Sequence, residues 1–386
     1  MSDNPQIQTQ TQAQARAPWL QAQLENLLAQ RGQAWLLSGP SGLGQFELAL
    51  ALAKAWLCET PTPHGACESC GSCHAFEVRT HADLCMLMPE TLFLAMDWPL
   101  DQKTQEVLDK KERKPSKEIK VDAARDAVTF TQVTRSRGNT KVVLVYPAER
   151  MNHITANTLL KTLEEPPGEV KFILATEAAH QLLPTIRSRC LGHTMRWPAF
   201  EDSLAWLQTA SQPGQAPVAA TGEEGEAPKK SRARAAAAPK AQDLRVLLAA
   251  TGGRPSDTLA WAQQGASDEA ARHWQALPKA MARGDVGALT DWTPKLAVDA
   301  LQKICHDMQA LAVGAAPRFF PVESLPAGSQ GVGSLWALGT WAKELAATAR
   351  KVEHPYNAGL MLEALVSRAS EALMSATAKP VGRGAG

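Results

Sequence analysis

The chain has 386 residues with a formal net charge of +1, and 45% of its residues are hydrophobic. Two or three domains are expected at this length, with enough buried apolar surface to fold without disulfides. The near-zero charge argues against a protein that binds nucleic acid over its whole surface. The polar, Gln-rich start is unlike a secretory signal, and no run reaches the roughly 20 apolar residues of a membrane span. We therefore expect a cytoplasmic protein whose seven cysteines are metal ligands or packed thiols rather than disulfides.

Short apolar strands and helices are predicted to alternate through the first half of the chain. The run at 142–145 is continuously apolar, as in a strand buried on both faces of a parallel sheet. This alternation predicts an α/β fold in which helices flank a parallel sheet. The predicted strands are 34–38, 84–88, 142–145 and 171–175, and the predicted helices are 18–30, 45–57 and 154–164.

Two segments interrupt this order. Residues 91–120 contain a stretch, from Asp101 to Lys120, that is dense in Lys and Glu with almost no apolar periodicity, and we interpret it as a solvated insertion. Residues 211–242 are rich in Ala, Pro, Gly and Lys, so we expect them to be a disordered linker rather than a basic arm that contacts DNA or a partner. From Asp243 onward the pattern is helical, which predicts an all-α C-terminal part.

A phosphate-binding loop is predicted between the first strand and the following helix. Gly39 and Gly44 keep the spacing of such a loop, and Gly42 lies between them. A working loop continues with Lys, which reaches the terminal phosphates, and Ser or Thr, which holds magnesium. Here those positions are Gln45 and Phe46, which offer neither a charge nor an oxygen ligand for a metal. We expect a degenerate loop whose glycines form a tight turn without nucleotide.

The acidic half of the ATPase machinery is also missing. P-loop ATPases carry an Asp at the end of a buried strand to organise magnesium. The strand at 142–145 is followed by Tyr146 and Pro147, and Glu149 comes too late to take that place. The sequence therefore predicts a chain that does not hydrolyse ATP.

Four closely spaced cysteines predict a zinc site. Four thiolates within sixteen residues match the ligand set of a structural tetrahedral zinc ion. An iron–sulfur cluster or a set of unliganded thiols would use the same residues. His64 and His74 are predicted to be surface residues, because four sulfurs complete the coordination shell. The predicted ligands are Cys58, Cys67, Cys70 and Cys73, and the isolated Cys85, Cys190 and Cys305 are predicted to be buried.

Three motifs resemble the clamp-loader family of AAA+ proteins. They are 159–167, which reads LLKTLEEPP, 172–176, which reads FILAT, and 183–190, which reads LPTIRSRC. The resemblance implies an AAA+ domain at 1–177 with the zinc module at 58–73, a small helical lid domain at 178–265, and a helical C-terminal collar for oligomerisation at 266–386.

The resemblance also implies a function. It implies a place in a heteropentamer with gamma or tau and delta subunits, which loads a sliding clamp on primed DNA. Arg189 falls in the position of an arginine finger that reaches the ATP site of a neighbouring subunit, with Arg187 two residues away. Without the resemblance, Arg189 would be interpreted as an ordinary surface ion-pair partner. Ser256 falls where active relatives carry a phosphate-sensing Arg, with Arg254 close by.

Two other functions use the same residues. An active ATPase subunit would need Gln45 to replace the missing Lys, and a remote acid to hold magnesium. A zinc-dependent nucleic-acid-binding module would use the four-cysteine segment and the basic runs, but the near-zero charge and the lack of aromatic residues among those runs argue against it. The sequence favours a non-hydrolysing loader subunit that contributes an arginine in trans.

Overall fold

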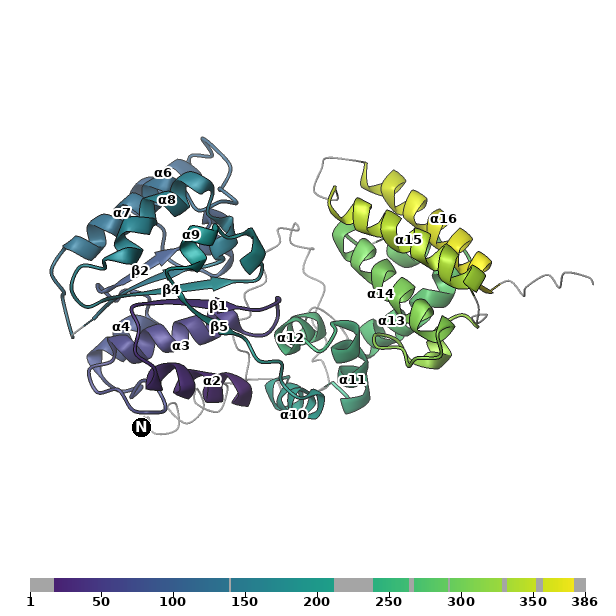
Figure 1. The fold of residues 1–386 in the computed structure, drawn as a ribbon, viewed down its shortest axis with the longest axis horizontal. Helices are drawn as coiled ribbons and strands as arrows, with labels where there is room; N and C mark the ends of the chain where they lie inside the picture. Colours follow the sequence, from purple (N-terminus) through teal and green to yellow (C-terminus); the bar gives the residue numbers. More distant parts are fainter. Residues whose placement is uncertain are drawn as a thin grey trace, which may run out of the picture. The chain divides into compact units, whose positions relative to one another are not determined.

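The computed structural model describes residues 17–138, 140–211, 239–263, 267–290, 292–327, 332–351 and 357–377. The chain forms two compact units, which Figure 1 shows in sequence colours. The first comprises residues 1–234 and 254–260, and the second comprises residues 235–253 and 261–386. The N-terminal segment 1–16 and most of the expected linker, 212–238, lie outside the described residues.

The first unit is built on a five-stranded sheet with the order β2-β3-β4-β1-β5. Every neighbouring pair is parallel, and β1 lies between β4 and β5, with Leu36 opposite both Leu174 and Gly192. Such a parallel order requires helical crossovers, as the alternating sequence predicts. The strands are β1 (Ala34–Ser38), β2 (Leu84–Leu87), β3 (Lys141–Val145), β4 (Val170–Thr176) and β5 (Leu191–Thr194).

Helices cover both faces of this sheet (Figure 1). Alternate residues of one strand enter different cores: Leu144 packs with α2 and α3, whereas Val143 packs with α7 and α8. The sheet is therefore buried on both sides, as a parallel sheet requires. The helices of this unit are α2 (Pro18–Ala29), α3 (Gln45–Leu57), α4 (Gly71–Glu77), α5 (Glu90–Ala95), α6 (Gln102–Asp109), α7 (Val121–Gln132), α8 (His153–Glu164), α9 (Pro184–Arg187) and α10 (Phe200–Ala210), with 3₁₀ turns η1 (Ala148–Arg150) and η2 (Ala179–Gln181).

The regular elements that the structure describes in the second unit are all helices. Its core contains the parallel stack of Trp274 on Phe320, with ring centroids 4.5 Å apart. The predicted helical C-terminal part is thus present, although Ala241 and Gln242 begin a helix instead of ending the expected linker. The elements are α11 (Ala241–Ala250), α13 (Ser267–Ala282), α14 (Pro294–Ala312), α15 (Val332–Ala349), α16 (Ala358–Thr377), η3 (Val286–Leu289) and η4 (Val322–Ser324). The helix α12 (Pro255–Gln263) has residues in both units.

The charged segment before α7 is not the fully solvated insertion that its composition predicts. Its helix α6 has no buried residue, but Ile119 is fully buried and its amide donates to the Arg150 carbonyl. Glu90 is buried and accepts hydrogen bonds from Arg113 Nη2 at 2.7 Å and the Ser116 amide at 2.9 Å, and it pairs with Lys120. A single buried carboxylate thus anchors the end of this segment.

None of the described helices combines the length and apolar character that crossing a membrane requires.

Cys305 is buried as predicted, but Cys85 and Cys190 are only partly buried, so the prediction of burial was wrong for these two thiols.

Replacing Glu90 with Gln should destabilise the first unit by roughly 1–3 kcal/mol, because buried hydrogen bonds to charged groups are lost. Burial opposes the effect, but Arg113 and Lys120 lower the pKa of Glu90 from 4.5 to about 2. Because the folded-state pKa is the lower one, this stabilisation is present above pH 4.5 and is lost as the pH falls toward about 2. Urea unfolding between pH 7 and pH 3 measures both effects.

The exposed Glu112 on the same segment provides the matched control, Glu112→Gln. Equal unfolding midpoints for the two variants would contradict the anchoring role of Glu90.

Candidate functional site

The predicted phosphate loop lies at the carboxyl end of β1, at the sheet edge where parallel α/β folds bind ligands. Gly42 and Gly44 have φ values of 76° and 91°, in the left-handed region that favours glycine. The next helix, α3, starts at Gln45. The structure therefore has the strand, the tight turn and the helix start of a phosphate loop.

Gln45 turns its side chain back onto this loop. Its Nε2 donates to the Gly39 carbonyl at 2.5 Å and to the Pro40 carbonyl at 2.6 Å, and the residue is only 3% exposed. A lysine in an active loop instead extends its ammonium toward the phosphates. The Gln45 side-chain amide already donates to two carbonyls of the loop, so it does not extend toward a phosphate as that lysine would.

An aromatic pair occupies the positions of the two magnesium-organising residues. Phe46 stands where an active loop has Ser or Thr, and Tyr146 follows β3, where the acidic residue belongs. Their rings stack with centroids 4.7 Å apart and planes inclined by 28°. Both residues are buried. Apolar contact thus replaces oxygen ligands at both places where a metal would be held.

The start of α12 contacts the same loop within the first unit. Arg254 Nη1 donates to Ser41 Oγ at 2.7 Å and pairs with Asp257 at 3.2 Å. The Ser256 amide donates to the Gly42 carbonyl at 3.2 Å. Of the two residues that the sequence offers for a sensing position, Arg254 is the one whose guanidinium reaches the loop.

Several carboxyl groups lie near the phosphate loop. Burial raises the pKa of Glu47, and the charge of Asp257 raises it further. Burial also raises the pKa of Glu177, with an added effect from Glu149. Thr176 Oγ1, at the end of β4, donates to Glu149 Oε2 at 2.6 Å. Burial therefore disfavours the charged form of the Glu47 and Glu177 carboxyl groups.

The four predicted metal ligands converge. All their Sγ atoms lie within 4.8 Å of one another, with Cys58 and Cys70 separated by 3.8 Å and Cys67 and Cys73 by 3.9 Å. A tetrahedral zinc ion with Zn–S distances of about 2.3 Å requires sulfurs about 3.8 Å apart. The donor set therefore fits zinc.

Backbone amides support this cluster. The Cys67 amide donates to Cys58 Sγ at 3.2 Å, and the Cys73 amide, at the start of α4, donates to Cys70 Sγ at 3.4 Å. Such hydrogen bonds orient sulfur ligands. His64 and His74 are exposed, as predicted.

Arg189 lies in the turn after α9. Its Nε donates to Glu164 Oε1 at 2.6 Å, Nη2 donates to the same oxygen, and Nη1 donates to the Thr185 carbonyl at 2.8 Å. Arg187 is exposed, and no described residue hydrogen-bonds or ion-pairs with its side chain. The sequence did not predict the partnership with Glu164, because the two residues lie 25 positions apart and meet only in the fold.

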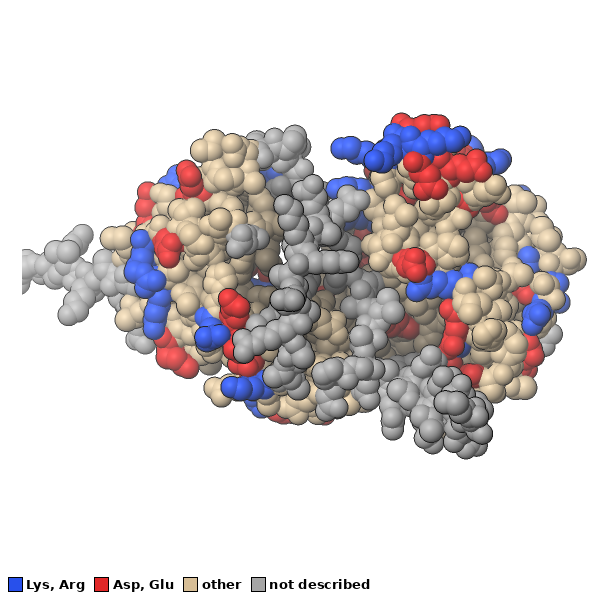
Figure 2. Space-filling view, turned by 180° about the vertical axis from the view of Figure 1, so that it is seen from behind, with Lys and Arg blue, Asp and Glu red and all other residues tan. Residues whose placement is uncertain are grey.

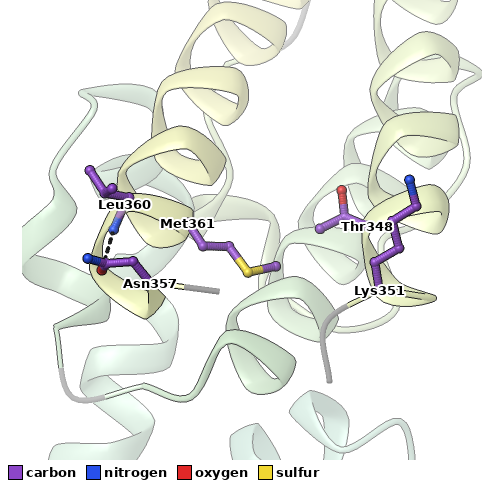
Figure 3. Close-up of a pocket in the computed structure, with 5 residues that line it drawn as sticks. All are labelled: Thr348, Lys351, Asn357, Leu360 and Met361. Atoms are coloured by element: carbon purple, nitrogen blue, oxygen red, sulfur yellow. Dashed lines mark hydrogen bonds between the residues drawn. The ribbon is translucent and has the colours of Figure 1, made fainter. Parts of the chain in front are cut away.

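The second unit contains a cavity of about 400 Å³ that lacks the charged and thiol groups of the sites described above, apart from one lysine (Figure 3). It lies between the end of α15 and the start of α16. The described lining contains no carboxylate, thiol or imidazole. It consists of Thr348, Lys351, Asn357, Leu360 and Met361.

The parallel sheet, the loop and the flanking helices define an α/β fold of the AAA+ type, with the geometry of a phosphate loop but not its chemistry. Residues 17–197 match the family model described as "DNA polymerase III, delta subunit". The N-terminal half of this chain thus resembles the delta-prime subunits of bacterial DNA polymerase III.

The curated relatives agree with this resemblance. The delta-prime subunit of Pseudomonas aeruginosa is 38% identical over 203 residues, which cover 52% of this chain and 55% of that protein. The delta-prime subunit of Escherichia coli K12 is 34% identical, with 49% of this chain and 52% of that protein covered. The chain therefore matches about half the length of these relatives. The tau subunit of Escherichia coli K12 is also 34% identical, over 41% of this chain and 20% of tau.

We expect one zinc ion per chain, measured by atomic emission after dialysis. Replacing Cys67 and Cys70 together with Ser should remove it, because two thiolates cannot complete the tetrahedral shell. The Cys85→Ala variant, outside the cluster, should keep its zinc. Stoichiometric iron would identify an iron–sulfur cluster instead, and the absence of both metals would leave unliganded thiols.

Proposed function

We propose that this chain is a non-hydrolysing subunit of a bacterial clamp loader, with gamma or tau and delta subunits as partners and with the sliding clamp and primed DNA as targets of the assembly. The observation that carries the proposal is the Phe46–Tyr146 stack, which fills the magnesium-organising positions of a loop that otherwise keeps its shape. The resemblance to delta-prime subunits supplies the context. An intact fold that lacks the chemistry is suited to a structural role beside active subunits.

Arg189 is proposed to act as an arginine finger in the ATP site of a neighbouring gamma or tau subunit. A guanidinium is always charged and binds phosphate oxygens with two donors, so it stabilises the charge that develops on a transferred phosphoryl group. Arg189 lies at the surface in a short turn, with its side chain 29% exposed. The ion pair with Glu164 is the state of the arginine in the single chain.

The zinc ion is proposed to be structural. All four ligand positions would be filled by cysteines, which leaves no open position for a water or a substrate. Lys54, on α3, pairs with Glu68 and Glu77 around the cysteine segment and ties it to the first domain.

The domain division is proposed to follow the clamp-loader plan, with an AAA+ domain at 1–177, a lid at 178–265 and an oligomerisation collar at 266–386. The helices of the second unit, including α14, α15 and α16, support a helical C-terminal part. Oligomerisation through these helices would place the first domain next to an ATPase neighbour.

The other two functions are less well supported. An active ATPase would need Gln45 to contact phosphate, but its amide is bonded to the loop carbonyls. For a nucleic-acid-binding module, Figure 2 offers no support, because basic and acidic side chains are interleaved over the face it shows.

The test of the finger is DNA-stimulated ATP hydrolysis by the reconstituted loader. An arginine finger contributes roughly 10³-fold or more to turnover at the site it serves. Arg189→Ala should therefore remove the share of turnover that one ATP site carries, while gel filtration shows an intact complex.

Arg187→Ala is the matched control and should keep full turnover. If Arg187→Ala removes turnover and Arg189→Ala does not, the finger is assigned to the wrong arginine. If neither variant changes turnover, the chain contributes no finger.

A further inference from the structure

Glu164 holds one edge of the Arg189 guanidinium. Nε and Nη2 both donate to a single oxygen of this carboxylate, Oε1. Glu164 is the last residue of α8, where the negative end of the helix dipole adds to the attraction for a cation. Pro166 and Pro167 follow and end the helix, so the carboxylate projects from a fixed position.

The opposite side of the guanidinium has a weaker partner. Nη1 donates to the Thr185 carbonyl at 2.8 Å, which is a neutral acceptor. A phosphate oxygen is a charged acceptor and forms stronger hydrogen bonds with guanidinium. Exchanging the carbonyl for a phosphate oxygen is therefore favourable and leaves the contact with Glu164 in place.

The Glu164–Arg189 ion pair contributes little to the free energy of folding. The side chains of Glu164 and Arg189 are 46% and 29% exposed, and exposed pairs contribute little to folding. Holding the arginine does have another effect: it removes rotamers that a free side chain would have to give up when it reaches the phosphate. The neighbouring Arg187 lacks any such partner among the described residues.

We propose that Glu164 is a positioning residue, which presents Arg189 to the ATP of the neighbouring subunit by holding its Nε edge while Nη1 exchanges the Thr185 carbonyl for a phosphate oxygen. This inference rests on the proposed finger role of Arg189. It gives the first carboxylate of the Glu164–Glu165 pair a role that the second does not share.

The experiment measures ATP hydrolysis by the reconstituted loader with DNA, and takes as the signal the turnover that Arg189→Ala removes. Glu164→Ala should lower the kcat of this component by about tenfold, as expected when one charge-assisted contact is lost, and should leave KM for ATP unchanged. Glu165→Ala is the matched control, because Glu165 is exposed and no described residue bonds to its side chain. Melting temperatures and gel filtration verify folding and assembly of each variant.

A double variant separates positioning from a general structural effect. In the Arg189→Ala background, Glu164→Ala should cause no further loss, because the group that it positions is absent. Full turnover of the Glu164→Ala loader, or a further loss in the double variant, would overturn the inference while leaving the finger intact. If Arg189→Ala itself has no effect, the proposed function fails first and the inference fails with it.

Discussion

The parallel alignment of the central strands is the constraint on which the rest of the first unit depends. Because β1, β3 and β4 run in the same direction, their carboxyl ends meet at one edge of the sheet. That edge brings together residues that are a hundred positions apart in the chain, such as Phe46 and Tyr146. In an active ATPase the same alignment assembles the phosphate loop with the metal-organising acid. Here it assembles a loop with an aromatic stack, so one geometric constraint produces a site with different chemistry.

The substitutions at this edge are mutually consistent. The Gln45 amide binds the loop carbonyls, Phe46 packs on Tyr146, and Arg254 contacts Ser41. Each of these interactions joins groups of the chain that would otherwise face a nucleotide. The loop is thus held in shape by internal contacts, which removes the need for a ligand to order it.

Much of this organisation could be predicted from the sequence, because strand and helix periodicity, loop glycines and cysteine spacing are local signals. The convergence of the four cysteines followed from their spacing. The strand β5 was missed because Leu191–Thr194 is short, contains a glycine and lacks a buried face. Glu90 and Glu164 could not be identified either, because their partners Arg113 and Arg189 meet them only after folding. Composition alone misjudged the segment after Asp101, since one buried carboxylate and Ile119 anchor a stretch that is mostly charged.

Calorimetric titration of the isolated chain with ATP and magnesium tests most directly whether the degenerate phosphate loop binds nucleotide. A clamp-loader subunit with an intact phosphate loop serves as the positive control. Because the loop lacks the lysine and the magnesium ligands, we expect no saturable binding up to about 1 mM ATP. A Kd of about 1 mM corresponds to a binding free energy of only about 4 kcal/mol. Saturable binding in the micromolar range that magnesium strengthens would show that the loop still holds a nucleotide, and would contradict the account.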